Sequence, residues 1–272
     1  MESIITQTLI SIQGEGIGIG RPILLIRFNG CNLNCSFCDT SWTNEKTNCQ
    51  EFDKIKNSTT PFIVNENNIY KYIEYISEKL LKNRNIRTVL FTGGEPFLNI
   101  PFMKLFINIT TELGLFNLFE IETNGTMFDR NFDFIYDYKK YIQLNISPKV
   151  HEYKKLYNGV FETIVNVIED EISTAIANCI YNPITNSNIK FVYSKEFEKE
   201  IDCFIKEFNM CIIPMIMSPL TPSYDIPDFN NVYRQNCLDT IDYCLRTGYK
   251  YTPRDHIFLF GKQREEFKSL KD

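Results

Sequence analysis

The residues best suited to chemistry are three cysteines within eight positions, in the stretch GCNLNCSFCDT at residues 30–40. Cys31, Cys35 and Cys38 have the spacing C-x3-C-x2-C, and Asp39 and Thr40 follow directly. Thiolates bind zinc ions and iron–sulfur clusters, both of which normally take four protein ligands. The group therefore predicts a metal centre that lacks one ligand within its own loop.

Three interpretations of these cysteines are open. Cys49 supplies the fourth ligand of a structural zinc site in the first, but zinc ligands usually come as two close pairs, and Cys49 lies in a polar stretch. In the second interpretation the three cysteines are unrelated reduced thiols, but their tight spacing argues against this. An iron–sulfur cluster with three thiolates is the third, and it leaves one iron for a ligand that is not protein.

The composition of the chain sets limits on its function. With 272 residues it is long enough for one large domain, and its net charge of −5 argues against a nucleic-acid partner. Nine cysteines, an odd number, exclude complete disulfide pairing. The sequence shows neither a signal peptide nor an apolar run of membrane-spanning length. We therefore expect a cytoplasmic protein with reduced thiols and no membrane partner.

Strand and helix patterns alternate along the chain. Short apolar runs predict strands, and apolar residues at helical spacing predict helices. The strands are expected at residues 23–28, 87–91, 118–122, 141–146, 190–193 and 211–217, and the helices at residues 67–81, 101–113, 131–138, 196–208 and 230–246. This alternation predicts an α/β fold with a mostly parallel sheet, as an open or closed barrel.

Polar or glycine-rich motifs follow the predicted strands. The cysteine loop follows the first, and TGGEP, TNGT and SPK follow the next three at residues 92–96, 123–126 and 147–149. Each of the last three alone is typical of a turn. Because loops at the carboxyl ends of parallel strands carry the active sites of barrels, their joint placement indicates one functional site.

A further motif, SIQGEG at residues 11–16, precedes the cysteines. Gln13 and Glu15 flank Gly14, and their donors and acceptors suit the edge of a pterin or purine. Arg27 lies near the end of an otherwise apolar strand, where a guanidinium usually needs an anion such as a carboxylate.

The cysteine spacing, with Phe37 before the last cysteine, and the motif GGEP at residues 93–96 resemble the radical S-adenosylmethionine superfamily. The resemblance implies a partial or modified (β/α) TIM-like barrel of the radical SAM type. It also implies a 4Fe–4S cluster whose open iron is chelated by S-adenosylmethionine. Within the superfamily, SIQGEG, RF-x-GC-x3-C-x2-CDT, TGGEP, ETNG and SPK resemble the 7-carboxy-7-deazaguanine synthases over residues 8–149.

That resemblance implies a reaction, the radical ring contraction of 6-carboxy-5,6,7,8-tetrahydropterin to 7-carboxy-7-deazaguanine with loss of ammonia, on the pathway to queuosine. It also implies that S-adenosylmethionine is used catalytically. It assigns the cluster to Cys31, Cys35 and Cys38 and Mg²⁺ to Thr40. It assigns S-adenosylmethionine to Phe37, Cys38, Asp39, Gly94, Glu95, Ser147, Pro148 and Lys149. It assigns the substrate to Ile12, Gln13, Gly14, Glu15, Arg27 and Thr92.

The carboxyl-terminal part of the chain matches more loosely. Residues 216–222 (IMSPLTP) resemble the last strand and loop of the family, which implies that Ser218 and Pro219 contact S-adenosylmethionine. Residues 253–261 (PRDHIFLFG) resemble its closing segment, with His256 as a candidate substrate contact. A lone histidine is also often only a packed surface residue.

We expect a single domain over residues 1–272, with insertions near 43–65 and 161–186 and a short extension at 262–272 that have no counterpart in the family. The insertion at 43–65 is polar and is expected to lie on the surface. The remaining cysteines are scattered, and we expect them to be small buried side chains: Cys179, Cys203, Cys211, Cys237 and Cys244.

The resemblance also implies a flavodoxin- or ferredoxin-type electron donor and a homodimer. Two alternatives stay open. One is a radical activase that acts on a partner protein, which leaves SIQGEG and CDT without a role. The other is a non-catalytic zinc-binding module.

Overall fold

The computed structural model describes residues 1–44, 49–52, 61–82, 84–128, 132–150, 153–157, 160–164, 187–207, 215–223 and 225–260. Its main sheet has ten strands: β1 (Glu2–Ile12), β2 (Pro22–Phe28), β4 (Gln50–Glu51), β5 (Phe62–Asn65), β6 (Thr88–Gly93), β7 (Leu118–Thr123), β8 (Ile142–Ile146), β11 (Asn188–Tyr193), β12 (Met215–Pro219) and β13 (Lys250–Tyr251). The spatial order is β13-β12-β11-β8-β7-β6-β2-β1-β5-β4.

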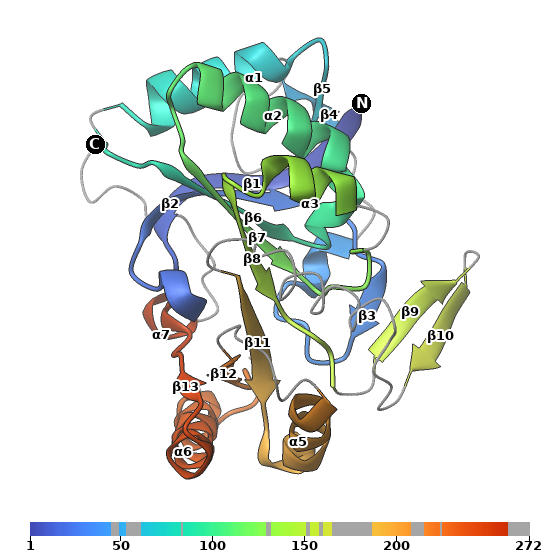
Figure 1. The fold of residues 1–272 in the computed structure, drawn as a ribbon, viewed down its shortest axis with the longest axis vertical. Helices are drawn as coiled ribbons and strands as arrows, with labels where there is room; N and C mark the ends of the chain where they lie inside the picture. Colours follow the sequence, from blue (N-terminus) through green and yellow to red (C-terminus); the bar gives the residue numbers. More distant parts are fainter. Residues whose placement is uncertain are drawn as a thin grey trace.

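Most of this sheet is parallel, as predicted. Every neighbouring pair from β2 through β6, β7, β8, β11 and β12 to β13 is parallel. The exception is β1, which runs antiparallel to both β2 and β5. The sheet is open and strongly twisted (Figure 1), so the TIM-like arrangement is partial. The carboxyl ends of the parallel strands meet at one edge.

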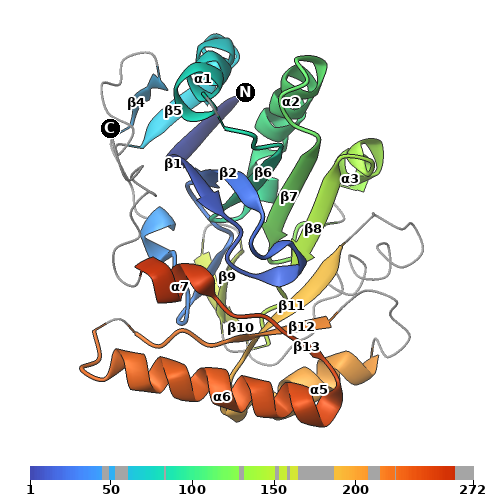
Figure 2. The same ribbon diagram turned by 90° about the vertical axis from the view of Figure 1, so that its left-hand side faces the viewer.

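Helices cover the outer face of the sheet. They are α1 (Ile69–Tyr75, continued by a π-helical turn at Ile76–Leu80), α2 (Ile100–Glu112), α3 (Phe132–Tyr138), α5 (Glu198–Glu207) and α6 (Phe229–Thr247). The last helix, α7 (Asp255–Phe260), lies instead beside the loop after β1, where the Asp255 amide donates to the Gly14 carbonyl. Figure 2 shows α1, α2 and α3 in one row, with α5 and α6 beside the strands β11 to β13. These crossovers join the parallel strands. The predicted helices are confirmed, with boundaries shifted by a few residues.

The core lies between the sheet and the helices. Alternate residues of β2 point into it, and Leu24, Ile26 and Phe28 are fully buried. Phe28 stacks on Phe91 of β6, and both pack edge-to-face against Phe102 of α2. Because side chains alternate along a strand, the residues between them face the other side of the sheet. That other side carries the cavity described below.

Two expectations about the first half of the chain were incomplete or wrong. The stretch at 43–65 was expected to be a surface insertion, yet β5 pairs with β1, and Phe62 and Val64 are buried in the core. The short alternating run FIVN at the end of a polar stretch was the missed signal. The strand β1 was also not predicted. Residues 45–48 and 53–60, and the proposed insertion beyond residue 164, lie outside the described residues, as does the extension at 262–272.

A second, three-stranded sheet involves the cysteine loop. It consists of β3 (Leu33–Cys35), β9 (Tyr153–Tyr157) and β10 (Val160–Ile164), in the order β10-β9-β3. The strand β3 pairs antiparallel with β9, and Cys35 lies opposite Tyr153. Figure 1 shows the β9–β10 hairpin projecting from the body of the protein beside this loop. The hairpin thus supports the loop that carries the cysteines.

The scattered cysteines do not all behave as predicted. Cys244 is buried, but Cys237 is only half-buried and Cys203 is exposed, so the prediction of a buried side chain is wrong for Cys203. Cys203 lies on the outward face of the amphipathic helix α5, where solvent reaches the side chain. Cys179 and Cys211 lie outside the described residues.

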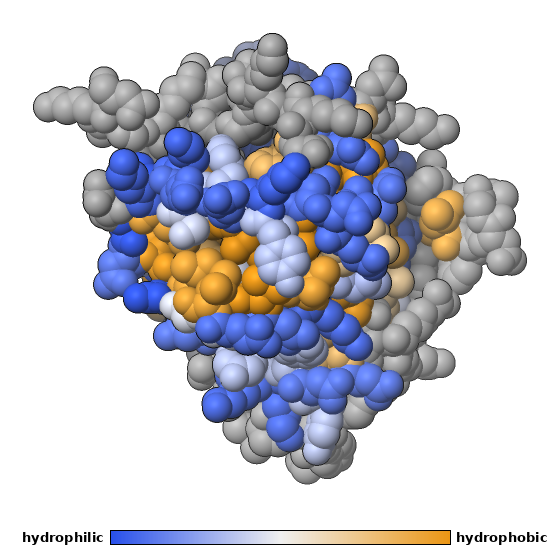
Figure 3. Space-filling view, turned by 90° about the horizontal axis from the view of Figure 1, so that it is seen from above, coloured by the Kyte–Doolittle hydropathy of each residue, from blue (hydrophilic) through white to orange (hydrophobic). Residues whose placement is uncertain are grey.

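One face of the protein carries a clear apolar feature. Seen from above, a strip of hydrophobic residues runs between bands of hydrophilic ones (Figure 3). Exposed apolar side chains of the described residues include Tyr70 on α1 and Leu113 at the end of α2. Within the described part of the chain, no helix has both the length and the apolar character that a membrane span requires.

Candidate functional site

One cavity of about 270 Å³ opens at the carboxyl edge of the parallel strands. This volume is on the scale of a small-molecule ligand, not of a folded partner. Alternation along the strands explains which side chains face it. Ile23, Leu25 and Arg27 of β2 line the cavity, as do Lys190 and Val192 of β11.

The cavity brings together most of the residues predicted from the sequence. Those that line it are Ile12, Gln13, Gly14, Glu15, Arg27, Cys31, Cys35, Phe37, Cys38, Asp39, Thr40, Thr92, Gly94, Glu95, Ser147, Lys149 and His256. Three predicted residues are not among the lining residues, namely Pro148, Ser218 and Pro219. Ser218 is fully buried and reaches the cavity indirectly, because its hydroxyl lies 3.4 Å from the Glu15 carboxylate.

The three cysteines lie on one wall of this cavity. The amide of Cys38 donates to the Cys35 carbonyl at 3.2 Å, which bends the loop. Asn32 ties the loop to the turn after β7 by hydrogen bonds with Asn124 and Thr126, at 3.0 and 2.7 Å. The loop is therefore held in place by its neighbours on the sheet edge.

The thiols suit a soft metal centre. Burial and, to a lesser extent, the Glu95 carboxylate raise the pKa of the Cys31 thiol to about 12, and burial raises that of Cys35 to about 11. A bound cationic centre is what would favour their thiolate forms. Among the described residues, no three histidine, cysteine or acidic side chains converge on a single metal ion, and this includes Cys49. Three neighbouring thiols on a cavity wall fit the ligand set of a cluster with one open iron.

The two glycines of TGGEP explain how that motif meets the cysteine loop. A Cβ atom on Gly94 would overlap the carbonyl oxygen of Gly30, and Gly93 has a φ of +113° that favours glycine. This close approach lets the Glu95 amide donate to the Gly30 carbonyl at 2.9 Å. The glycine motif is therefore docked directly on the first residues of the cysteine loop.

The carboxylate of Glu95 is fixed at the cavity wall. It is 1% exposed, and it accepts hydrogen bonds from the Thr123 hydroxyl at 2.8 Å and from the Asn124 amide at 2.9 Å. The Phe97 amide adds a third hydrogen bond at 3.1 Å. Burial raises the pKa of Glu95 above its usual value, and these donors offset only part of that rise. The group is a rigid acceptor for a cationic ligand.

Asp39 and Thr40 lie next to the last cysteine. Arg254 forms an ion pair with the Asp39 carboxylate, and His256 Nε2 lies 3.9 Å from it. Burial would raise the pKa of Asp39, but Arg254 and His256 hold it well below the usual range, so the group is an anion. The Thr40 hydroxyl donates to the Gly93 carbonyl at 3.4 Å.

The SIQGEG loop closes the opposite side of the cavity. The Gln13 amide group donates to the buried Glu120 carboxylate at 2.8 Å, and Arg21 forms an ion pair with the same group. Gly14 lies against His256, because a Cβ atom on Gly14 would come within 2.7 Å of the imidazole Nδ1. The Asp255 amide also donates to the Gly14 carbonyl at 2.9 Å. The closing segment and the SIQGEG loop are thus in direct contact.

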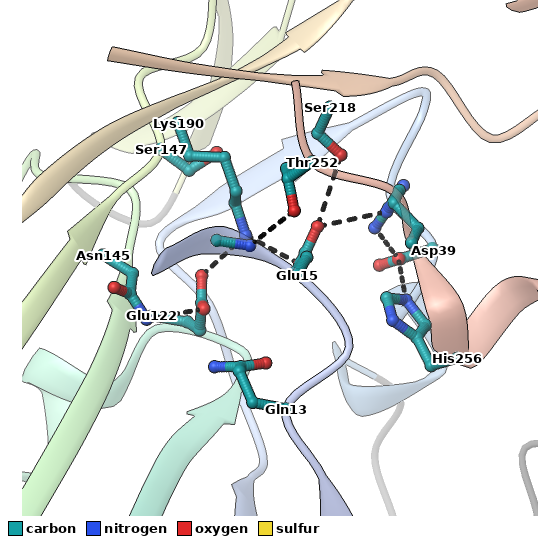
Figure 4. A network of polar contacts seen from close by, with 12 residues as sticks. Gln13, Glu15, Asp39, Glu122, Asn145, Ser147, Lys190, Ser218, Thr252 and His256 are labelled. Carbon is teal, nitrogen blue, oxygen red and sulfur yellow. Dashed lines mark hydrogen bonds and ion pairs between the residues drawn. The ribbon is translucent and has the colours of Figure 1, made fainter. Parts of the chain in front are cut away.

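Three charged residues of the site were missed by the sequence analysis. Lys190 forms ion pairs with Glu15 at 2.6 Å and with Glu122 at 2.8 Å (Figure 4). Arg254 lies 3.3 Å from the Glu15 carboxylate and also pairs with Asp39. Lys190 carried the same signal as Arg27, a cation in an otherwise apolar strand. Glu122 belongs to the motif ETNG and Arg254 to the segment PRDHIFLFG, but the sequence analysis assigns a role only to other residues of these stretches.

Glu15 is the centre of this network. Burial would raise the pKa of its carboxyl group, but Lys190 and Arg254 lower it to about 2, so Glu15 is an anion. Figure 4 shows its carboxylate between Lys190 on one side and the Asp39–His256 side of the cavity on the other. The chain can therefore present fixed acceptors and donors to one ligand beside the cysteine wall.

Comparison with known proteins gives consistent results. The family model described as Radical SAM superfamily matches residues 25–182. A 7-carboxy-7-deazaguanine synthase of Rickettsia prowazekii is 30% identical over 259 residues, which cover 92% of this chain and 84% of that relative. Another, of Clostridium acetobutylicum, is 34% identical over 142 residues, and the match spans 50% of this chain and 55% of that relative.

A solved structure shares the fold. The crystal structure of QueE from Escherichia coli superposes with a TM-score of 0.55, over 93% of this chain and 94% of that chain. The sequences are 19% identical in that comparison, so the likeness concerns the arrangement of strands and helices.

Proposed function

Because this chain belongs to the radical S-adenosylmethionine superfamily and, within it, to the 7-carboxy-7-deazaguanine synthase family, we propose that it contracts the ring of 6-carboxy-5,6,7,8-tetrahydropterin. The product is 7-carboxy-7-deazaguanine, a precursor of queuosine, and ammonia is lost. One observation carries the proposal. A single cavity holds a wall of three cysteines and, facing it, a loop of fixed acceptors and donors.

The family implies a 4Fe–4S cluster and S-adenosylmethionine as cofactors. When bound, they supply a 5′-deoxyadenosyl radical that takes a hydrogen atom from the substrate. Cys31, Cys35 and Cys38 would hold the cluster. Glu95 is a buried acceptor that suits the amino group of S-adenosylmethionine. The other residues proposed to hold this cofactor are Phe37, Asp39, Gly94, Ser147 and Lys149 from the cavity wall, supported by Pro148, Ser218 and Pro219.

A magnesium ion is proposed at Thr40. Magnesium takes oxygen ligands and keeps several from water or substrate, so the protein can contribute as little as one threonine hydroxyl. The Thr40 hydroxyl lines the cavity beside the Asp39 carboxylate, which adds negative charge there. An ion at this position would lie between the cysteine wall and the SIQGEG loop.

The substrate is proposed to lie against Ile12, Gln13, Gly14, Glu15, Arg27, Thr92 and His256. The guanidinium of Arg27 suits the substrate carboxylate, since it forms paired hydrogen bonds with such groups. Its Nε donates to Gln7 at 2.9 Å, which orients the side chain in the cavity. Glu15 is held as an anion and can accept from the N–H groups of the pterin ring.

We further propose that the chain is one domain that works as a cytoplasmic homodimer and receives electrons from a flavodoxin or ferredoxin. Family membership speaks against the alternative of a non-catalytic zinc-binding module. The motifs SIQGEG and CDT speak against the alternative of an activase, because an activase would leave both without a role.

The test is an anaerobic assay of reconstituted enzyme with the carboxytetrahydropterin, S-adenosylmethionine, Mg²⁺ and a reductant. We expect 7-carboxy-7-deazaguanine and ammonia in equal amounts. Cleavage of S-adenosylmethionine without the deazapurine product would point to another substrate. A protein that binds zinc and acquires no iron–sulfide absorbance would overturn the radical chemistry itself.

A further inference from the structure

Lys190 lies in an unusual place for a lysine. It stands in β11 between Ile189 and Phe191, which are both fully buried in the core. The alternation of the strand turns Lys190 to the cavity, where its side chain is only 4% exposed. Its ammonium group is clamped between the carboxylates of Glu15 and Glu122, at 2.6 and 2.8 Å (Figure 4).

The clamp fixes both the charge and the direction of this ammonium group. Burial would lower the pKa of Lys190, but the Glu122 and Glu15 carboxylates raise it to about 12, so the group stays protonated. An ammonium has three N–H donors, and these two ion pairs account for two of them. A third donor can serve a ligand in the cavity. No step of the proposed reaction has used it.

The edge of a pterin supplies a matching acceptor. Its pyrimidine ring carries an amino group and a ring N–H, which are donors, next to a carbonyl oxygen, which is an acceptor. The complement of this edge is a carboxylate beside a fixed cationic donor. Glu15 and Lys190 form such a pair on the cavity wall, with Glu122 on the far side of the ammonium.

Resting on the proposed function, we propose that Lys190 determines specificity by donating a hydrogen bond to the ring carbonyl oxygen of the pterin, while the flanking carboxylates accept from the adjacent N–H groups. A ligand with an amino group in place of that carbonyl would point N–H donors at the Lys190 ammonium group, which is itself a donor. Such a mismatch leaves a charged donor unpaired, which selects strongly between otherwise similar ligands.

The experiment uses two stable ligands, 6-carboxypterin and its 2,4-diamino analogue, in which an amino group replaces the ring carbonyl and the adjacent ring nitrogen loses its hydrogen. Their affinities for the reconstituted holoenzyme are measured by titration calorimetry, for the wild type, Lys190→Met and Lys195→Met. Lys195 is an exposed lysine in the short turn that follows the same strand, and it serves as the matched control. Iron content and the melting temperature show that each variant has folded with its cluster.

We expect the wild type and Lys195→Met to bind the oxo ligand ~10–100-fold more tightly than the diamino ligand, as for one hydrogen bond to a charged group. Lys190→Met should lose most of this preference, because binding of the oxo ligand weakens and that of the diamino ligand does not. Equal weakening of both ligands would overturn the inference, since it would mean that Lys190 only supports its neighbours.

Wild-type measurements alone also decide. A wild type that binds both ligands with equal affinity would overturn the role of Lys190 without any variant, even if a variant failed to fold. A wild type that binds neither ligand, and cleaves S-adenosylmethionine without forming the deazapurine, would overturn the proposed function as well. A wild type that makes the product but lacks the preference would overturn the inference alone.

Discussion

The two walls of the cavity are built in different ways. The cysteine wall is held by backbone contacts between neighbouring strand ends, such as Glu95 N to the Gly30 carbonyl. The opposite wall, formed by the SIQGEG loop with Lys190 and Arg254 and here called the substrate wall, is held by ion pairs between segments far apart in the chain. Examples are those of Glu15 with Lys190 and Arg254. The first wall is thus fixed by local motifs, whereas the second depends on charges that the fold brings together.

The largest effect is expected on the cysteine wall. Cys35→Ala should abolish the cluster and all turnover, because two thiolates cannot hold what three do. Iron content, visible absorbance and product formation measure the outcome. Cys203→Ala, at an exposed cysteine on α5, is the matched control and should keep full activity. A Cys35→Ala variant that retained the cluster would show that another residue provides the ligand.

The backbone contacts of the same wall are tested by Gly94→Ala. The added Cβ would overlap the Gly30 carbonyl, and the resulting strain should cost roughly 3 kcal/mol of stability and impair cluster loading. Thermal unfolding and iron content are the measurements. Gly20→Ala is a milder comparison, because Gly20 has a φ of +80° with nothing within 4 Å, and should cost only about 1 kcal/mol. Equal effects of both changes would contradict the proposed docking of the motif.

The contact between the walls is tested by Arg254→Met. Removal of this buried cation leaves Asp39 and Glu15 without a shared partner, so we expect product formation to fall by ~10–100-fold. Cleavage of S-adenosylmethionine should fall less, which raises the ratio of 5′-deoxyadenosine to product. Arg246→Met removes an exposed ion pair with Glu198 and should change neither rate. An unchanged ratio in Arg254→Met would mean that the residue only supports the fold.

The smallest effect is expected at the proposed magnesium ligand. Thr40→Ala should keep the cluster and raise the Mg²⁺ concentration needed for half-maximal activity by roughly 10-fold, because one oxygen ligand is lost. Thr40→Ser keeps the hydroxyl and should behave like the wild type. The measurement is activity across a magnesium titration. If Thr40→Ala and the wild type gave the same titration curve, Thr40 would not be a ligand.

The same contrast explains what could be predicted from the sequence. The cysteine wall was predicted in detail because Cys31, Gly94 and Ser147 stand in short motifs directly after strands. The substrate wall was predicted only in part. Lys190 meets Glu15 across 175 positions of sequence, and no local pattern encodes that pairing.

Two further features could not be predicted for similar reasons. The strand β5 is short and follows a polar stretch, so its burial depends on the pairing with β1. The partner of Gln13 is Glu120 in β7, a buried carboxylate whose role appears only when the two segments meet. His256 was a weak candidate in the sequence, and its contact with Gly14 places it on the cavity wall.

The central claim is that radical chemistry starting at the cysteine wall acts on a pterin held by the substrate wall. The most direct measurement uses carboxytetrahydropterin deuterated at C6, with reconstituted enzyme and unlabelled S-adenosylmethionine. Mass spectrometry of the recovered nucleoside reports the transfer. We predict that deuterium appears in the 5′-deoxyadenosyl group together with formation of the deazapurine. Product formed with no deuterium in that group would contradict the account.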